Sequence, residues 1–292
     1  MNVTVAKSAG FCFGVSRAVE LVEHSAGQGG RTLTLGPIIH NRHVVERFEK
    51  MGVRVIEQPE DASAGDTVII RSHGVSRDVY KRLEAQGATI IDATCPFVKR
   101  IHKIISQAEQ EGKFPIIIGT PTHPEVEGIA GWCTRCKVFA DAESLENWVR
   151  EEAIPADLPV CMVSQTTSTE FLWKKCVQFA KKQFTYLQTF DTICRATECR
   201  QREASELSQR CEAMVVVGDL KSSNTGRLAM ICRGHCDKVF LVDNASELNL
   251  DDFRGVSDVG ITAGASTPAW IIKEVNKTMS ETPNVEAVQE EN

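Results

Sequence analysis

Eleven cysteines are the residues of this 292-residue chain that most directly suggest chemistry. Because the number is odd, the thiols cannot all pair as disulfides. We therefore expect some of them to bind a metal or to act in catalysis. Three cysteines precede predicted helices: Cys12, Cys95 and Cys194. A helix N-terminus favours the thiolate, which is the form that binds metal. Three thiolates brought together could hold a [4Fe–4S] cluster with one iron left open, whereas structural zinc would want a fourth ligand.

The alternative for these three cysteines is that they are separate buried thiols. The remaining cysteines include a C-x2-C pair, Cys133 and Cys136, and a second close pair, Cys232 and Cys236. The spacing of the two pairs resembles that of a four-cysteine zinc site. However, the pairs precede strands of different segments and are expected to lie far apart, so one zinc ion bound by both pairs is not favoured. The last four are expected to pack as small apolar residues: Cys161, Cys176, Cys199 and Cys211.

A repeated pattern of elements predicts how these residues are positioned. Short apolar strands, polar loops and amphipathic helices alternate three times, which is typical of parallel α/β sheets. The first strand of each copy is predicted at 32–36, 115–119 and 214–218, and the second at 68–70, 160–163 and 259–263. The sequence therefore predicts an α/β fold of three pseudo-repeated βαβ-type lobes around a pseudo-threefold axis, with the three cysteines at the centre.

A third strand ending in cysteine is predicted in two of the copies, at 91–95 and 190–194. The last copy has no such strand after its final helix, and the N-terminal segment 3–7, which leads to Cys12, supplies one. The predicted domains are therefore lobe 1 at 13–95, lobe 2 at 96–193 and lobe 3 at 194–280, completed by residues 1–12. Residues 281–292 have no periodicity and four acidic groups, so a loose tail is predicted.

Polar loops follow the predicted strands and suggest an anion pocket, because ligands of parallel sheets bind at the carboxyl ends of strands. Imidazoles, hydroxyls and an amide at helix N-termini suit a diphosphate. Glu125 is the only acid among these loops; it is either a helix N-terminal carboxylate or a proton donor. The candidate residues are His40, His73, His123, Thr166, Thr167, Ser222, Ser223, Asn224, Ser266 and Thr267.

Charge and hydropathy exclude other classes of function. The net charge of −6 offers no basic excess for nucleic acid. No apolar run approaches the roughly 18 residues that span a membrane, and the first residues lack a signal-peptide pattern. A cytoplasmic protein is therefore expected. No Walker or G-x-G-x-x-G sequence is present to indicate nucleotide binding.

Six stretches, taken in order, carry a resemblance to a known family: 9–15 (AGFCFGV), 71–75 (RSHGV), 92–96 (DATCP), 122–126 (THPEV), 164–167 (SQTT) and 222–225 (SSNT). The chain resembles the 4-hydroxy-3-methylbut-2-enyl diphosphate reductases, the last enzymes of the methylerythritol phosphate route to isoprenoids. The resemblance spans roughly residues 3 to 275. Asp219-Leu220-Lys221 and the extra thiol of Cys199 depart from the family pattern.

The resemblance implies reductive dehydroxylation of an allylic diphosphate to isopentenyl and dimethylallyl diphosphate, with electrons from a ferredoxin or flavodoxin. It implies a [4Fe–4S] cluster on the three cysteines, proton delivery by Glu125, and contact of Thr166 with the substrate hydroxyl. It also implies diphosphate contacts from His40, His73, His123, Ser222, Ser223, Asn224 and Ser266. Two other classes remain open: a [4Fe–4S] hydro-lyase, and a non-catalytic zinc- or anion-binding module.

Overall fold

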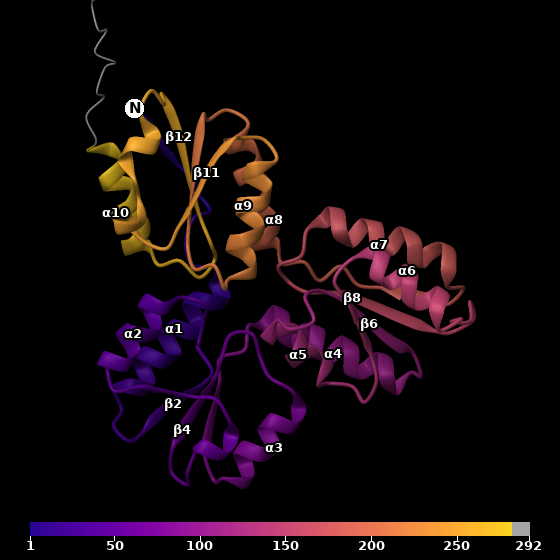
Figure 1. The fold of residues 1–292 in the computed structure, drawn as a ribbon. Helices are drawn as coiled ribbons and strands as arrows, with labels where there is room; N and C mark the ends of the chain where they lie inside the picture. The colour runs from indigo at the N-terminus through magenta and orange to yellow at the C-terminus, as the bar shows by residue number, and fades with distance from the viewer. Residues whose placement is uncertain (282–292) are drawn as a thin grey trace, which may run out of the picture. The chain divides into compact units, whose positions relative to one another are not determined.

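The computed structural model describes residues 1–281, and the predicted tail beyond Glu281 lies outside them. Strands and helices alternate along this part of the chain (Figure 1). The strands are β1 (Asn2–Val5), β2 (Thr32–Leu35), β3 (Arg54–Ile56), β4 (Thr67–Ile70), β5 (Thr89–Asp92), β6 (Phe114–Ile118), β7 (Lys137–Phe139), β8 (Val160–Ser164), β9 (Leu187–Thr189), β10 (Ala213–Val217), β11 (Lys238–Val242) and β12 (Asp258–Ala263). The α-helices are α1 (Phe13–Ala26), α2 (Arg42–Lys50), α3 (Arg77–Ala85), α4 (Pro96–Gln110), α5 (Pro124–Ala130), α6 (Ala142–Glu151), α7 (Glu170–Gln183), α8 (Arg195–Ser208), α9 (Ser223–Arg233) and α10 (Ala269–Ser280).

The strands form three four-stranded parallel sheets with the same internal order. The orders are β3-β2-β4-β5, β7-β6-β8-β9 and, for the third sheet read from its other edge, β11-β10-β12-β1. In each sheet the first strand of a copy pairs with the second, and a third strand takes the edge beside the second. The prediction of an α/β fold of three repeated lobes is confirmed.

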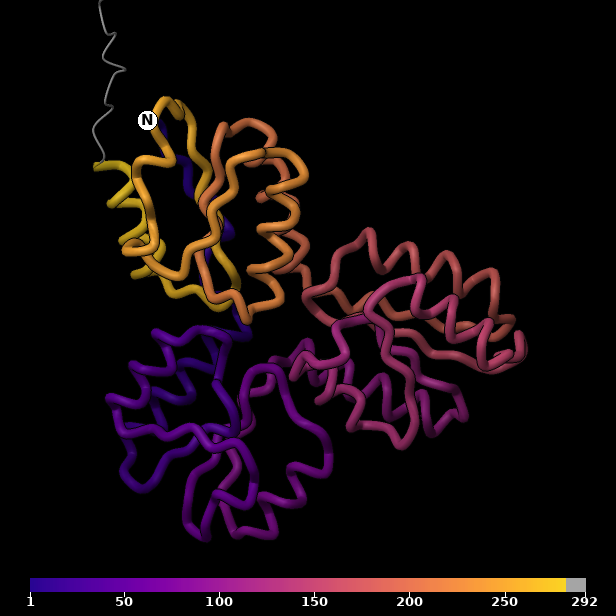
Figure 2. The backbone as a smooth tube through the Cα atoms, viewed as in Figure 1, coloured from indigo at the N-terminus to yellow at the C-terminus, as the bar shows by residue number. Residues whose placement is uncertain are grey.

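The N-terminal strand β1 pairs in parallel with β12, so that Val3 lies opposite Val259. Figure 2 shows this first segment of the chain running among the segments of the last lobe. By contacts, the described chain divides into two compact units: residues 1–12, 40–44 and 195–281, and residues 13–39 and 45–194. The second unit holds two sheets, and the predicted lobe boundaries stay a prediction.

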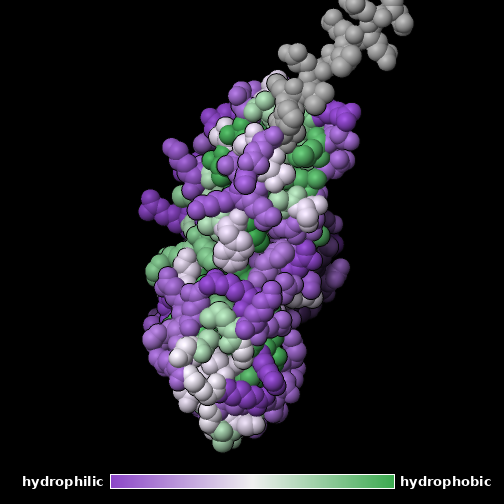
Figure 3. Space-filling view, turned by 90° about the vertical axis from the view of Figure 1, so that its left-hand side faces the viewer, coloured by the Kyte–Doolittle hydropathy of each residue, from purple (hydrophilic) through white to green (hydrophobic). Residues whose placement is uncertain are grey.

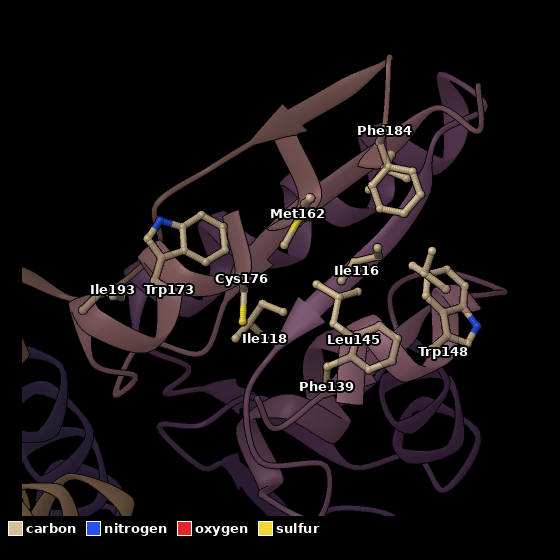
Figure 4. Close-up of a cluster of buried hydrophobic side chains, with 13 residues drawn as sticks. Ile116, Ile118, Phe139, Leu145, Trp148, Met162, Trp173, Cys176, Phe184 and Ile193 are labelled. Carbon is tan, nitrogen blue, oxygen red and sulfur yellow. The ribbon is translucent and has the colours of Figure 1, made fainter. Parts of the chain in front are cut away.

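The sheet of β6 and β8 shows why these sequences form strands. Ile116, Ile118 and Met162 point to one face, where they pack with Trp148 of α6 and Trp173 of α7 (Figure 4). Ile117 and Val163 point to the other face and pack against α4 and α5. Apolar residues therefore occupy every position of a strand that is covered on both faces, which is typical of parallel sheets.

The surface drawn in Figure 3 is mostly hydrophilic, with apolar side chains in small patches. Among residues 1–281, none of the helices combines the length and the apolar character that crossing a bilayer requires.

The predicted strand at 190–194 is wrong in position, because β9 covers Leu187–Thr189 and ends before Cys194. The strand at 91–95 is likewise shorter, since β5 ends at Asp92. An aspartate carboxylate explains both ends: Asp92 accepts from the N–H of Thr94, and Asp191 from the N–H of Ile193. Such local side-chain hydrogen bonds compete with the ladder and turn the chain out of the sheet.

Candidate active site

The three cysteines of the predicted cluster have the same backbone environment, each within its own lobe. The N–H of Cys95 donates to the carbonyl of Ser72, at 2.9 Å, and that of Cys194 to the carbonyl of Thr166, also at 2.9 Å. The N–H of Cys12 donates to the carbonyl of Ala265, at 3.2 Å. Each accepting residue stands in the loop after the second strand of its lobe, so the three cysteines occupy one repeated position.

Each cysteine also stands directly before a helix. Cys12 precedes α1, Cys95 is the N-cap residue of α4, and Cys194 precedes α8. The side chains are half-buried, so the sulfur atoms keep access to a ligand. Unsatisfied N–H groups at a helix N-terminus favour negative charge, which suits a thiolate-bound group.

Two arginines, the half-buried Arg17 and the buried Arg200, hold the turns that lead to two of these cysteines. The guanidinium of Arg17 donates to the carbonyls of Asp92 and Thr94, three residues and one residue before Cys95. The guanidinium of Arg200 donates to the carbonyl of Gly10 at 2.7 Å, two residues before Cys12. Neither arginine was expected from the sequence, because nothing in its spacing links α1 or α8 to these turns.

Gly14 in α1 lies against the thiol of Cys95. A Cβ added at Gly14 would stand 2.5 Å from the sulfur and 3.1 Å from the Cβ of Cys95. Only glycine therefore leaves the sulfur in its present place.

Gly14→Ala is expected to displace the Cys95 side chain and to lower the iron retained after anaerobic purification, because the clash is within the range that forces atoms to move. Iron and sulfide content per chain measure the effect. Gly226→Ala is the matched control, since it is also a helical glycine and has no atom within 4 Å of an added Cβ. Full iron content in Gly14→Ala would show that the sulfur position is not needed.

The loops after the first strands repeat a second feature. The N–H groups of Gly36, Gly119 and Gly218 donate to carbonyls of the neighbouring strands, Ile56, Phe139 and Val242, at 2.8, 2.9 and 2.8 Å. Helices follow these loops, and the candidate residues stand at their starts. His123 is the N-cap residue of α5, and Ser222 is the N-cap residue of α9. His40 lies two residues before α2.

The loops after the second strands align by their turns. The N–H groups of Gly74, Ser168 and Thr267 donate to the carbonyls of Arg71, Gln165 and Gly264. This alignment gives His73, Thr167 and Ser266 one equivalent position. The position before it is held by the three residues whose carbonyls bind the cysteine N–H groups: Ser72, Thr166 and Ala265.

Glu125 is fully buried and is held at both oxygens by Thr166. The N–H of Thr166 donates to Oε1 at 2.6 Å, and the hydroxyl of Thr166 donates to Oε2 at 2.7 Å. Burial raises the pKa of Glu125 above its usual value, and the two hydrogen bonds from Thr166 oppose that rise. The carboxyl group can therefore keep a proton at a pH where an exposed glutamate has lost it.

Two imidazoles continue the series from Glu125: His123, which stands two residues before it, and His73, which contacts His123. The Nδ1 of His123 accepts from the N–H of Glu125 at 3.1 Å. The other ring nitrogen, Nε2, takes no part in this hydrogen bond. The rings of His73 and His123 meet edge to face, with 5.5 Å between centroids. Hydrogen bonds and ring contact thus connect Cys194, Thr166, Glu125, His123 and His73 in series.

Three candidate residues of the other unit are buried polar groups: Ser222, Asn224 and Ser266, at 6%, 3% and 6% exposure. Within the described residues, both polar atoms of the Asn224 amide and the hydroxyl of Ser266 have no hydrogen-bond partner. Buried polar atoms without partners are destabilising, so these three atoms are available to hydrogen-bond a ligand.

The remaining cysteines divide by burial. Cys161, Cys176, Cys232 and Cys236 are buried, whereas Cys133, Cys136, Cys199 and Cys211 are half-buried. Cys211, which follows α8, packs against a buried cluster of its lobe, as expected, whereas Cys199 on α8 is half-buried and its packing stays a prediction.

Fold and site together define an α/β protein of three repeated lobes, each of which presents one cysteine at the start of a helix. The sequence profile of the LytB protein family matches residues 3–280, and the chain belongs to this family. The 4-hydroxy-3-methylbut-2-enyl diphosphate reductase of Caldanaerobacter subterraneus is 42% identical over 280 residues, which cover 94% of this chain and 95% of that protein. The Clostridium perfringens protein of the same name is 42% identical, covering 96% and 99%.

The chain is also similar to two solved structures of such reductases. The structure described as (E)-4-hydroxy-3-methyl-but-2-enyl diphosphate reductase, the terminal enzyme of the non-mevalonate pathway, superposes with a TM-score of 0.70 at 38% identity, covering 97% of this chain and 100% of that one. The E-1-hydroxy-2-methyl-but-2-enyl-4-diphosphate reductase of Plasmodium falciparum gives a TM-score of 0.90 at 27% identity, covering 96% and 88%. The predicted family is confirmed.

Proposed function

We propose that the chain is a 4-hydroxy-3-methylbut-2-enyl diphosphate reductase. The reaction adds two electrons and two protons to the substrate, breaks its C4–O bond, releases water, and gives isopentenyl and dimethylallyl diphosphate. The observation that carries the proposal is the hydrogen-bonded series from Cys194 through Thr166 to the buried carboxyl of Glu125. It connects the backbone of a cysteine suited to binding a metal cluster with a carboxyl group suited to holding a proton.

Cys12, Cys95 and Cys194 are proposed to hold a [4Fe–4S] cluster. Support comes from their equivalent N–H hydrogen bonds and helix N-terminal positions, which match three like ligands better than three unrelated thiols. When bound, such a cluster supplies electrons singly and a Lewis-acidic iron for the substrate hydroxyl. A ferredoxin or flavodoxin is the proposed donor.

The diphosphate is proposed to bind to the imidazoles and hydroxyls at the strand ends: His40, His73, His123, Ser222, Ser223, Asn224 and Ser266. The unpartnered amide of Asn224 and hydroxyl of Ser266 support this assignment, because phosphate oxygens would complete their hydrogen bonding. The helix starts at Ser222 and His123 add N–H donors and a favourable dipole.

Glu125 is proposed to hold the proton that the reaction consumes. Its Oε2 contacts the hydroxyl of Thr166, which can accept that proton while passing its own towards the substrate. Thr166 also fixes the carboxyl group through its N–H, so the donor keeps one orientation. Burial excludes water from the carboxyl oxygens and restricts the proton to this route.

The decisive experiment is turnover of the substrate by anaerobically purified protein with a one-electron chemical reductant. Formation of both isopentenyl and dimethylallyl diphosphate, in a brown preparation containing iron and sulfide, is expected. Turnover without any reductant would indicate a hydro-lyase instead. A colourless protein that contains zinc would indicate a binding module.

His73→Asn is expected to raise KM about ten- to a hundredfold, because one charge-assisted hydrogen bond contributes about 1.5–3 kcal/mol. Steady-state kinetics and the cluster absorbance of the same sample measure the effect. His24→Asn, on the exposed side of α1, is the control and should leave KM unchanged. An unchanged KM in His73→Asn would remove this imidazole from the diphosphate site.

A further inference from the structure

The loop after β4 lies against the second half of α5 at very close range. We call residues 73–76 the His73 loop. A Cβ added at Gly128 of α5 would stand 3.3 Å from two backbone atoms of this loop, and one added at Gly131 would stand 2.1 Å from the Cβ of Ser76. Gly131 has a φ of −72° and Gly128 is helical, so other residues could adopt their backbone conformations. The close approach of the loop, not the backbone conformation, therefore calls for glycine at both positions.

Hydrogen bonds tie the same loop to the end of α5. The indole N–H of Trp132 donates to the carbonyl of Val75 at 2.9 Å. The N–H of Arg77 donates to the carbonyl of Gly131 at 3.3 Å, and its guanidinium donates to the carbonyl of Trp132 at 3.2 Å. The residues on both sides of Ser76 are thus bound to the end of α5.

Gly74, the residue directly after His73, is also closely approached by α4. A Cβ added at Gly74 would stand 2.8 Å from the Cε1 of His102 and 2.9 Å from the Cγ2 of Thr94. The imidazole of His102 is buried and stacks on the ring of Trp132, with 4.8 Å between centroids. Burial lowers the pKa of His102 to about 4, so the packed ring is neutral at pH 7. The backbone that follows His73 is therefore packed against two helices.

The helix α5 is firmly anchored to its own lobe. Val126 and Ile129 are fully buried and pack with residues of β6 and β8. The carboxyl group of Glu125 accepts two hydrogen bonds from Thr166. His123 is the N-cap residue of the same helix, so its backbone is fixed with the helix. We therefore expect a side chain added on α5 to displace the loop rather than the helix.

We propose that Gly128 and Gly131 are positioning residues for the diphosphate site, because they allow the His73 loop to lie against α5 and bring the imidazole of His73 to that of His123. The two rings come from different lobes and meet edge to face, with 5.5 Å between centroids. A pair of donors that is already in place pays less ordering entropy when the anion binds. The inference rests on the proposed function, since it takes both imidazoles as diphosphate contacts.

Gly131→Ala tests the proposal directly. The added Cβ would overlap the side chain of Ser76, so the loop must move away from α5. We expect KM to rise about tenfold, the lower end of the effect expected of His73→Asn, with kcat and iron content near wild type. The Kd for inorganic pyrophosphate, measured by calorimetry on the anaerobic holoenzyme, should rise by a similar factor. Gly226→Ala is the matched control, since an added Cβ there has no atom within 4 Å.

Two double variants separate positioning from a general loss of packing. Ser76→Gly removes the Cβ and Oγ that the new methyl group would meet, so combining it with Gly131→Ala should recover part of the lost affinity. In a His73→Asn background, Gly131→Ala should have no further effect on KM or Kd, because the contact through which it acts is already missing.

Gly128→Ala provides a milder variant that can be measured if Gly131→Ala yields no folded protein. Its added Cβ would meet the loop at 3.3 Å instead of 2.1 Å, so it should raise KM and Kd by a smaller factor and show the same dependence on His73. Unchanged KM and Kd in the folded glycine variants, or effects that add fully to that of His73→Asn, would overturn the proposal. If wild type binds pyrophosphate but does not reduce the substrate, the proposed function fails, whereas the Kd values still decide the role of the glycines.

Discussion

Cys95→Ser is expected to remove the visible absorbance of the cluster and nearly all reductase activity. A serine hydroxyl is a poor ligand for iron, and Cys95 is one of only three proposed protein ligands. The measurement is iron and sulfide per chain after anaerobic reconstitution, with turnover of the same sample. The backbone N–H that donates to Ser72 is unaffected by the change, so the fold around residue 95 should persist.

Cys211→Ser is the matched control, since Cys211 is half-buried and outside the proposed site. It should keep its iron and its rate. A Cys95→Ser protein with a complete cluster and full turnover would exclude Cys95 as a ligand.

Glu125→Gln is expected to lower kcat by about 10²–10⁴, the usual contribution of a general acid or base. The amide keeps the shape of the side chain but has no acidic proton to give. Substrate affinity and cluster content should stay near wild type, because neither the diphosphate contacts nor the cysteines change. Glu127→Gln, an exposed change on the same helix, is the control and should leave kcat within a few-fold.

The pH dependence of the free energy of unfolding, compared between wild type and Glu125→Gln, provides an independent readout. Burial raises the folded-state pKa of Glu125 above the ordinary value of 4.5, so the folded state binds this proton more tightly than the unfolded state. The stabilising contribution is complete below about pH 4.5 and is lost as the pH rises through the folded value. The free energy of unfolding of wild type, relative to Glu125→Gln, should therefore fall with rising pH and then level off. If Glu125→Gln has a normal kcat, a normal cluster content and a normal substrate affinity, Glu125 is only a carboxylate that stabilises the start of its helix.

Strand periodicity predicted the fold well because buried parallel strands are apolar at every position. The runs at 115–118 and 214–217 fall inside β6 and β10. The position predicted for the edge strand β9 was wrong because an edge strand buries fewer apolar side chains and so has a weaker sequence pattern. In addition, the carboxylate of Asp191 accepts from the N–H of Ile193 and turns the chain before Cys194. Whether an aspartate caps a turn or continues a strand depends on backbone geometry that composition does not show.

The candidate site could be predicted in its residue types but not in its pairings. Glu125 and Thr166 were both singled out, yet 41 residues separate them, and only the fold shows that one binds the other. The carbonyls of Ser72 and Ala265 have no sequence signature, because any residue can supply a backbone acceptor. Gly14 was part of the family pattern, but its packing against the Cys95 sulfur requires coordinates.

The pairing of β1 with β12 has a consequence for biosynthesis. The sheets of β2–β5 and β6–β9 can close while the ribosome is still translating the rest of the chain, because each uses strands from one continuous stretch. β1 emerges first but must wait for Asp258–Ala263 before it is paired, and the amide of Cys12 waits for Ala265. Closing so long a loop is slow. Of Cys12, Cys95 and Cys194, Cys12 is thus translated first, and its backbone is fixed last.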